Sequence, residues 1–352
     1  GWEKDSHYCL FDFGKIAHGV YRDETPSAAH GHADILSFEI CVSGKPLIID
    51  PGFYTYFGPL EWHRYFRATR GHNNIEVNGT GQAQHESRIS WSCVSEPRKQ
   101  LWVFTSEWDL VSAAVDRFAG LNENVSHHRF IFFVKEAYCL IFDLIDSSNK
   151  GREFTVENFL HFSPGDLQLK NDTFYRQDQP VLYMKGKPGF ASRIENGGPL
   201  PEQGWTAPGY GQKIAAPVIH QSAKTRLPLI NCMLFPMDAK VRDLSFQSKE
   251  QGLMMLEIQS DNSLEKVYLN PLQKVIEMED VDNCRTNALL TRVVFDKKSP
   301  IRFEVAHCSQ LENQNVSVLQ DYKAAAGFTV RHNQEFEDNN IKIIEESGKN
   351  DI

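Results

Sequence analysis

The 352-residue sequence has no long apolar run and no excess of basic residues. Without an uninterrupted apolar stretch of about 20 residues, a transmembrane helix is not expected. Lys and Arg number 37 against 46 Asp and Glu, so the net charge is −9. A protein that binds a phosphate backbone normally carries the opposite sign. The composition therefore argues against an integral membrane protein and against nucleic acid as the main partner.

Paired cysteines are also missing. The seven cysteines are odd in number and scattered, with no Cys-x-x-Cys pair. Several lie in strand-like runs, where a free thiol behaves as a small hydrophobic side chain. We therefore predict buried free thiols and no disulfide framework. The chain begins at Gly1 without an initiator Met or a signal peptide, so we expect an excised or processed part of a longer protein.

Helical periodicity is the fourth absence. No stretch longer than about ten residues repeats its apolar positions with the helical period, and nothing alternates strand with helix. Short runs rich in Val, Ile, Phe and Tyr are instead separated by clusters of Gly, Pro, Asn and Asp. Ser43-Gly44-Lys45 has the composition of a tight hairpin connection. The pattern predicts an all-β fold, a large antiparallel multi-sheet β-sandwich.

We expect residues 1–332 to form this sandwich, with a division near residue 240 into a larger and a smaller sheet layer. Residues 333–352 are acidic and polar and are expected to form a solvated tail. The segment 186–216 holds seven Gly and four Pro, which predicts a long ordered loop.

Residues suited to chemistry gather between positions 27 and 80. His30-Gly31-His32 is expected to open one strand, Asp50 ends the next apolar run, and His72 precedes a third. If the backbone is extended, His30 and His32 share one face. Two imidazoles and one carboxylate suit Zn²⁺. However, His32, Asp50 and His72 stand 18 and 22 positions apart, which matches no compact zinc signature. Polar residues at a sheet rim remain the alternative.

A cupin-type metal site is a second alternative, because it also uses His-x-His followed by Glu. Six residues lie between His32 and Glu39, more than the cupin pattern has. Strand parity would also place these two side chains on opposite faces. The cupin interpretation is therefore disfavoured.

Several short motifs follow one another in this segment: His30-Gly31-His32-Ala33-Asp34, Ser37-Phe38-Glu39, Leu47-Ile48-Ile49-Asp50-Pro51-Gly52, Tyr54-x-Tyr56, Tyr65-Phe66-Arg67-x-Thr69 and His72-Asn73. Gly204-Trp205-x-Ala207-Pro208-x-Tyr210-Gly211 is a fainter piece downstream. In this order they resemble the C-terminal β-sandwich domain of the heparinase II/III family of polysaccharide lyases.

The resemblance implies one structural zinc ion. In the family, zinc is held by the second His of the His-x-His pair, the Asp before Pro-Gly and the His before the Asn-rich strand. These positions correspond to His32, Asp50 and His72.

The resemblance also points the first His of the pair, His30, into the substrate cleft as the candidate active-site residue. Tyr54, Tyr56 and Arg67 are the expected substrate-binding residues for an anionic sugar. The alternative is that the tyrosines pack in the interior and that Arg67 lies on a solvated rim. For the nearby Arg70 we favour this solvated position.

The reaction implied is β-elimination at a uronic acid residue, in which the C5 proton is removed and the C4–O bond breaks. Neutralising the uronate carboxylate stabilises the enolate-like transition state. A histidine at position 30 suits this task, or proton transfer, because imidazole exchanges protons near neutral pH.

Full-length relatives carry an N-terminal α/α toroid that supplies a catalytic Tyr and an Asn or His, and this sequence has no such region. We therefore expect the C-terminal part of a larger lyase, inactive by itself, whose substrate is an acidic polysaccharide such as heparin, heparan sulfate or alginate. The resemblance implies a periplasmic or secreted location. The alternative function is a non-catalytic, metal-clipped β-sandwich that binds glycan or supports a partner domain.

Overall fold

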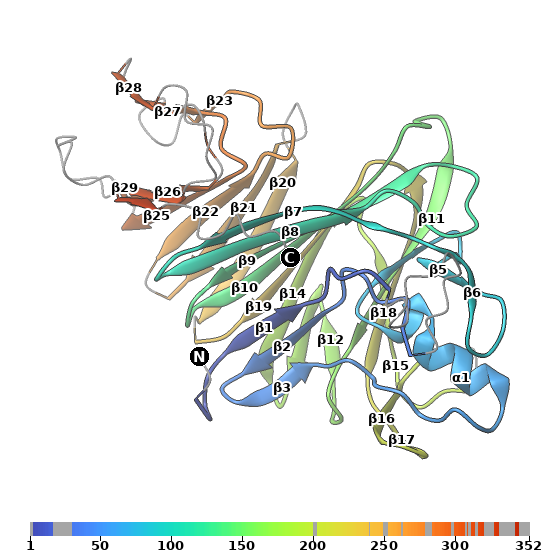
Figure 1. The fold of residues 1–352 in the computed structure, drawn as a ribbon. Coiled ribbons are helices and arrows are strands. Elements are labelled where there is room, and N and C mark those ends of the chain that lie inside the picture. Colours follow the sequence, from blue (N-terminus) through green and yellow to red (C-terminus); the bar gives the residue numbers. More distant parts are fainter. Residues whose placement is uncertain are drawn as a thin grey trace. The chain divides into compact units, whose positions relative to one another are not determined.

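The computed structural model describes residues 3–16, 30–199, 203–238, 240–248, 253–261, 263–278, 284–296, 299–306, 308, 311–313, 316–319, 327–330 and 342–344. These residues form antiparallel β-sheets with one α-helix, α1 (Leu60–Arg67), and one 3-10 turn, η1 (Thr69–Gly71) (Figure 1). The predicted all-β, antiparallel fold class is therefore confirmed. In the part of the chain described, no helix is long and apolar enough to cross a bilayer.

The chain divides into two compact units. The first comprises residues 1–100, 112–131 and 139–237, and the second comprises residues 101–111, 132–138 and 238–352.

Four small sheets belong to the first unit. One has the order β1-β2-β3, with β1 (Tyr8–Phe11), β2 (Phe38–Val42) and β3 (Lys45–Ile48). Another has the order β15-β18-β11-β4, with β15 (Ala191–Glu195), β18 (Val218–Arg226), β11 (Glu153–His161) and β4 (Ile75–Val77). The other two are hairpins, β5 (Ala83–His85) with β6 (Trp91–Val94) and β16 (Trp205–Gly209) with β17 (Gln212–Ala215).

The largest sheet has eight strands in the order β12-β13-β14-β19-β10-β9-β8-β7. Their bounds are β12 (Gln168–Lys170), β13 (Thr173–Arg176), β14 (Gln179–Lys187), β19 (Leu229–Pro236), β10 (Tyr138–Ser147), β9 (Val125–Val134), β8 (Trp108–Val115) and β7 (Pro97–Phe104).

Two sheets belong to the C-terminal part of the chain. A seven-stranded sheet has the order β20-β21-β22-β25-β26-β29-β30, with β20 (Val241–Ser248), β21 (Met254–Ser260), β22 (Leu264–Leu269), β25 (Leu290–Asp296), β26 (Ser299–Ala306), β29 (Gly327–Val330) and β30 (Lys342–Ile344). A four-stranded sheet has the order β23-β24-β27-β28, with β23 (Ile276–Met278), β24 (Cys284–Thr286), β27 (Leu311–Asn313) and β28 (Val316–Leu319).

The β2–β3 hairpin shows how local sequence determines local structure here. Val42 pairs with Lys45, and the two residues between them have positive φ values, 49° at Ser43 and 72° at Gly44. This backbone suits a two-residue turn that follows the natural twist of the strands. A Cβ atom at Gly44 would lie 2.0 Å from the carbonyl oxygen of Lys4, so only glycine fits. The predicted hairpin is confirmed.

Two apolar clusters lie among the described residues of the first unit. One includes Ile75, Val77, Phe154 and Val156, which face inward on β4 and β11. A second cluster anchors the segment that follows the His-Gly-His motif, with the members Ile16, Ala33, Ile35, Leu36, Trp91, Ala113 and Val115. Each fully buried Ile or Val side chain contributes roughly 1.5–3 kcal/mol. The loop that carries the site described below therefore packs directly against the apolar core.

Three expectations differ from the structure. His30-Gly31-His32 lies in a loop, because β2 begins only at Phe38 and Leu36 adopts a left-handed backbone with φ of 73°. Helix α1 was not expected. The predicted loop at 186–216 contains β15, β16 and β17. Of the predicted acidic tail at 333–352, only β30 is described, and it pairs with β29. The rest of that segment lies outside the described residues.

Candidate functional site

The His-Gly-His loop is the first part of the site. The main-chain N–H of Ala33 donates to the carbonyl oxygen of Arg67 at 2.9 Å, and the N–H of Ser37 donates to that of Asp34 at 2.7 Å. The side chain of His30 is exposed, whereas those of His32 and Asp34 are half-buried. Because this loop forms no ladder hydrogen bonds of its own, contacts from other segments determine where its side chains lie.

Asp50 and His72 form the second part. Asp50 lies two residues beyond the end of β3, and His72 follows η1 directly. The Nδ1 atom of His72 donates to Oδ2 of Asp50 across 2.6 Å, and the N–H of Gly52 donates to the other carboxylate oxygen at 2.8 Å. Burial by itself would lower the pKa of His72, but the Asp50 carboxylate outweighs it and raises this pKa to about 9. The two side chains therefore form an ion pair between a buried imidazole and a half-buried carboxylate.

A third group brings these parts together. Ligand atoms of His32, Asp34 and His72 lie within 4.8 Å of one another, close enough to hold a metal ion. Burial, reinforced by His72, lowers the pKa of His32 to about 3, so its imidazole is neutral at pH 7 and has a lone pair to donate. The structure thus brings His32 and His72 together as expected, adds Asp34, and joins Asp50 to the group through His72.

His30 has a different partner. Its Nδ1 atom lies 2.6 Å from the hydroxyl of Tyr56, and the two rings meet edge to face with centroids 5.6 Å apart. The pair combines an imidazole and a phenol, both able to give or take a proton, at an exposed position next to the metal-ligand cluster. Such a pair is suited to acid–base chemistry.

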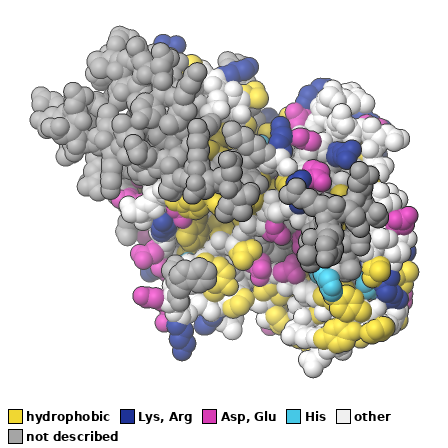
Figure 2. Space-filling view, in the orientation of Figure 1, with side chains coloured by type: hydrophobic (Ala, Val, Ile, Leu, Met, Phe, Trp, Pro, Cys, Tyr) yellow, Lys and Arg dark blue, Asp and Glu magenta, His cyan; other side chains and the backbone are white. Residues whose placement is uncertain are grey.

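An aromatic surface surrounds this pair. Phe57 is 80% exposed and Tyr210 is 59% exposed, although such side chains are more often buried. The Tyr210 hydroxyl accepts a hydrogen bond from the main-chain N–H of Tyr56 at 3.3 Å. Figure 2 shows histidine side chains at the surface with hydrophobic side chains gathered beside them. Tyr54 is half-buried, packed against Trp62 with ring centroids 6.3 Å apart.

A single lysine adds positive charge to this surface. The Nζ atom of Lys213 lies 3.8 Å from the ring centre of Trp205 and 4.1 Å from that of Trp62. Within the described residues Lys213 makes no ion pair with a carboxylate, and its ammonium lies over two indole rings.

Arg67 does not lie as expected for a substrate contact. Arg67 is fully buried, and its guanidinium donates to the carbonyl oxygens of Gly31 and Arg88. Arg70 binds the carboxylate of Glu76, with Nη2 2.5 Å from Oε2. The expectation that Arg67 touches substrate is therefore revised to a structural contact with the loop that bears His30 and His32.

Several buried polar residues near the site were missed from the sequence. The Asn73 side chain donates to the carbonyl oxygens of Phe38 and Ile49 and accepts the N–H of His161, so it joins three segments. Arg129 is fully buried on β9, where its Nη1 atom donates to the carbonyl oxygens of two site loops, at Leu36 and Asn73. The position of Asn73 beside His72 could have indicated from the sequence that this residue supports the site. The position of Arg129 on a strand gives no such indication.

His161 is a further buried imidazole, at the end of β11. Burial, reinforced by His72, lowers its pKa to about 3, so it is neutral. Its position at a strand end, like that of Asp50, was the only sequence signal.

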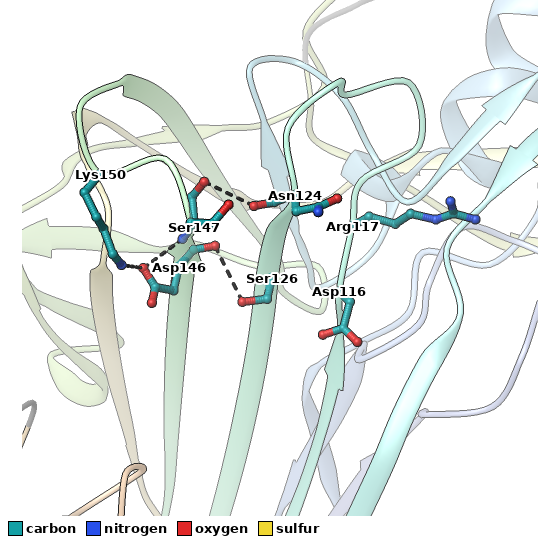
Figure 3. A pocket seen from close by; sticks show the side chains of 8 residues that line it. Asp116, Arg117, Asn124, Ser126, Asp146, Ser147 and Lys150 are labelled. Atoms are coloured by element: carbon teal, nitrogen blue, oxygen red, sulfur yellow. Dashed lines mark hydrogen bonds and ion pairs between the residues drawn. The ribbon is translucent and has the colours of Figure 1, made fainter.

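A separate polar pocket of about 450 Å³ lies at one end of the eight-stranded sheet (Figure 3). Its lining residues are Asp116, Arg117, Asn124, Ser126, Asp146, Ser147, Ser148 and Lys150. Lys150 pairs with Asp146 and Arg98 pairs with Asp116, so the acids are already neutralised by basic neighbours. None of the expected site residues lines this pocket.

Comparison with solved structures shows the fold. A heparinase III gene product superposes with a TM-score of 0.58 at 19% identity, over 77% of this chain and 40% of that protein. Heparan sulfate lyase HepC of Pedobacter heparinus superposes with a TM-score of 0.57 at 14% identity, with the same two coverages. The chain therefore spans about 40% of the length of these structures.

Sequence comparisons show the family as well as the fold. A heparin-sulfate lyase of Bacteroides stercoris is 29% identical over 126 residues, which make up 35% of this chain and 17% of that enzyme. The family model described as heparinase II/III-like, C-terminal, matches residues 2–229, well over half of the chain and most of the first unit. The protein is therefore a member of the heparinase II/III-like C-terminal family.

Proposed function

We propose that this chain is the C-terminal β-sandwich of a polysaccharide lyase that cleaves uronic-acid-containing glycans by β-elimination. The observation that carries the proposal is the exposed His30–Tyr56 pair, 2.6 Å apart, next to a cluster of histidines and carboxylates. Membership of the heparinase II/III-like C-terminal family supports the same conclusion.

The proposal includes one zinc ion held by His32, Asp50 and His72. The donor set suits this metal, since it provides two imidazoles and a carboxylate. Nε2 of His72 supports the fit, because it is buried and has no hydrogen-bond partner in the described part of the chain. Asp34 offers a further carboxylate within reach of both histidines. When bound, zinc would cross-link three segments and stabilise the site, with no part in bond breaking.

The reaction would proceed at the surface beside His30. Removal of the C5 proton of the uronate forms the C4–C5 double bond, while the C4–O electron pair leaves with the glycosidic oxygen, which takes up a proton. His30 would donate a hydrogen bond to the uronate carboxylate and offset the charge that develops there. Tyr56 would orient the imidazole of His30 through its hydroxyl.

The glycan would bind along the aromatic surface of Tyr54, Tyr56, Phe57 and Tyr210. Sugar rings present apolar faces that pack on aromatic side chains, and the carboxylates need a cation. Lys213 supports this assignment because it has no carboxylate partner among the described residues. Such a local charge can attract an anionic chain despite the net charge of −9.

We further propose that a helical N-terminal α/α toroid completes the cleft and supplies the remaining acid–base groups, and that the enzyme is periplasmic or secreted. Support comes from the share of the relatives that this chain spans, about 40% of the solved structures.

The test is an elimination assay on the complete gene product with unsulfated and sulfated heparan chains and with alginate, following ultraviolet absorbance of unsaturated uronides. We expect a rate for the parent and a loss of at least 100-fold for His30→Ala, with zinc content close to one equivalent in both. His7→Ala serves as the control because His7 directly precedes β1 and its Nδ1 accepts the N–H of Ser43 in the turn between β2 and β3. No elimination with any of these glycans would reject the lyase and favour the non-catalytic, glycan-binding β-sandwich.

A further inference from the structure

Arg67 occupies an unusual position for a charged side chain. It is the last residue of α1 and has an exposed fraction of 0%. A buried guanidinium is stable only when its N–H groups find acceptors, since burying an unpaired charge is costly. Burial accordingly lowers the pKa of Arg67, yet the group remains charged at any physiological pH. The hydrogen-bond acceptors of Arg67 therefore indicate its role.

The first acceptor is the peptide between the two histidines. Nε and Nη2 of Arg67 both donate to the carbonyl oxygen of Gly31, at 3.2 Å and 2.8 Å. The carbonyl oxygen of Arg67 accepts the N–H of Ala33 at 2.9 Å. Arg67 thus holds the backbone on both sides of His32. This loop is outside any strand, so these contacts replace the ladder hydrogen bonds that it lacks.

The second acceptor leads to the partner of His30. Nη1 of Arg67 donates to the carbonyl oxygen of Arg88 at 2.7 Å. The side chain of Arg88 in turn donates to the carbonyl oxygens of Tyr56, at 2.9 Å, and Gly58, at 3.0 Å. One guanidinium therefore restrains both the loop that carries His30 and, through Arg88, the loop that carries Tyr56.

The plane of the guanidinium is also fixed. Its central carbon lies 4.7 Å from the ring centre of Trp91, which is buried in the cluster beneath the site. A lysine could keep the charge but would supply neither the planar fork nor the stacking surface.

We propose that Arg67 is a positioning residue that sets the His30–Tyr56 hydrogen bond and the direction of His32 from the same guanidinium. What the histidines then do rests on the proposed function. Both the acid–base pair and the proposed metal ligand His32 then depend on Arg67 for their positions.

The test compares Arg67→Lys and Arg67→Met with Arg64→Lys and Arg64→Met in the 352-residue chain. Arg64 lies on the same helix but is exposed, so its variants are matched controls. The readouts are amide hydrogen exchange of Ala33, the ring resonances of His30 and Tyr56, the zinc dissociation constant and the melting temperature. We expect Arg67→Lys to speed Ala33 exchange at least tenfold, to shift both rings, and to weaken zinc binding by about 10–100-fold.

A purely structural role would lower the melting temperature of Arg67→Lys while leaving the His30 and Tyr56 resonances and Ala33 exchange as in the Arg64 variants, and that result would overturn the proposal. If Arg67→Met does not fold, the Arg67→Lys variant alone tests the proposal. If the parent chain binds no zinc, the metal part of the proposed function is wrong. The ring resonances of His30 and Tyr56 and the exchange of Ala33 still test the positioning role of Arg67. In the complete enzyme, Arg67→Lys should lower kcat at least tenfold with KM within twofold.

Discussion

Buried arginines stabilise loops in the first unit of this protein and a β-sheet in the second. In the first unit they serve loops: Arg67 donates to the carbonyl oxygen of Gly31, and Arg129 donates to those of Leu36 and Asn73. Leu36 has the left-handed backbone, with φ of 73°, that a non-glycine residue rarely adopts. The site loops therefore depend on side-chain donors from elsewhere in the fold.

In the second unit a buried arginine serves a sheet. Arg292 on β25 lies directly opposite Glu304 on β26, and the two side chains pair at 2.9 Å. Its Nε atom donates to Glu265 on β22 at 2.8 Å, and that carboxylate also accepts the Tyr138 hydroxyl at 2.6 Å. All of these partners are side chains, because the strand carbonyls are already paired in the ladder.

The difference shows what a loop-built site requires. A strand satisfies its own backbone groups with its neighbours, so Arg292 inside its sheet pairs with carboxylate side chains. A loop at the core must have its backbone groups satisfied by other donors, because buried polar groups without partners are costly. Removing an arginine contact should therefore move the site in the first unit and affect only stability in the second.

The largest effect is expected at Asp143, which accepts from Nε and Nη2 of Arg129 and from Nε2 of His127, all fully buried. Asp143→Asn leaves the guanidinium without its counter-charge and should cost about 3–5 kcal/mol of unfolding free energy. Chemical denaturation measures this cost. Asp116→Asn is the control: its ion pair with Arg98 is exposed, and a change above about 1 kcal/mol there would undermine the comparison.

The metal-ligand cluster comes next. Asp50→Asn removes the proposed carboxylate ligand and the partner of His72, so zinc binding should weaken about 100-fold. Asp34→Asn should weaken it about tenfold, since Asp34 lies within reach of His32 and His72 but outside the proposed ligand set. Competition with a calibrated chelator gives both dissociation constants. The reverse order would replace Asp50 by Asp34 as the carboxylate ligand.

Glu304→Gln tests the sheet-bound arginine. Arg292 keeps Glu265 as its partner, so the expected loss is smaller, about 1–3 kcal/mol of unfolding free energy. Zinc affinity and the His30 resonances should not change. A change in either would show that the second unit affects the site and would break the contrast between the two units.

The smallest effect concerns pH and His220, whose ring nitrogens lie 2.9 Å from Glu157 and 2.8 Å from Glu195. Burial and the nearby Arg193 lower its pKa, but the two carboxylates outweigh them and the net pKa is raised. A raised folded-state pKa means that the stabilisation is complete below about pH 6.5 and fades as the pH rises through the folded value.

The stability difference between the parent chain and His220→Gln, about 1 kcal/mol, should therefore shrink from pH 6 to pH 9. Denaturation midpoints across that range measure it. A difference that grows with pH would mean that His220 is neutral in the folded protein.

Much of the architecture could be predicted because it depends on local patterns. Strand runs separated by turn residues indicated the antiparallel sheets, and Ser43-Gly44 indicated its hairpin, since a two-residue turn with positive φ is a local property. Helix α1 was missed because its eight residues are too few for a periodic signal. Strands β15 to β17 were missed because their Gly and Pro content is typical of loops.

The site divides in the same way. Its histidines and Asp50 could be named from motifs in the sequence, and their roles as zinc ligands and active-site residue remain predictions. The role of Arg67 could not be foreseen, because a single arginine in a sequence is usually a surface residue. Its acceptors, Gly31 and Arg88, stand 36 and 21 positions away and become neighbours only in the folded chain.

The sequence by itself determined the fold class, the family and the short segment that bears the chemistry, because these follow from residue types and their local order. Only the tertiary structure decided which side chains face solvent, which arginines are buried, and that Tyr56 meets His30. The physical reason is that burial and hydrogen-bond partners depend on contacts between distant segments, and the cost of an unpaired buried group selects one arrangement of those contacts.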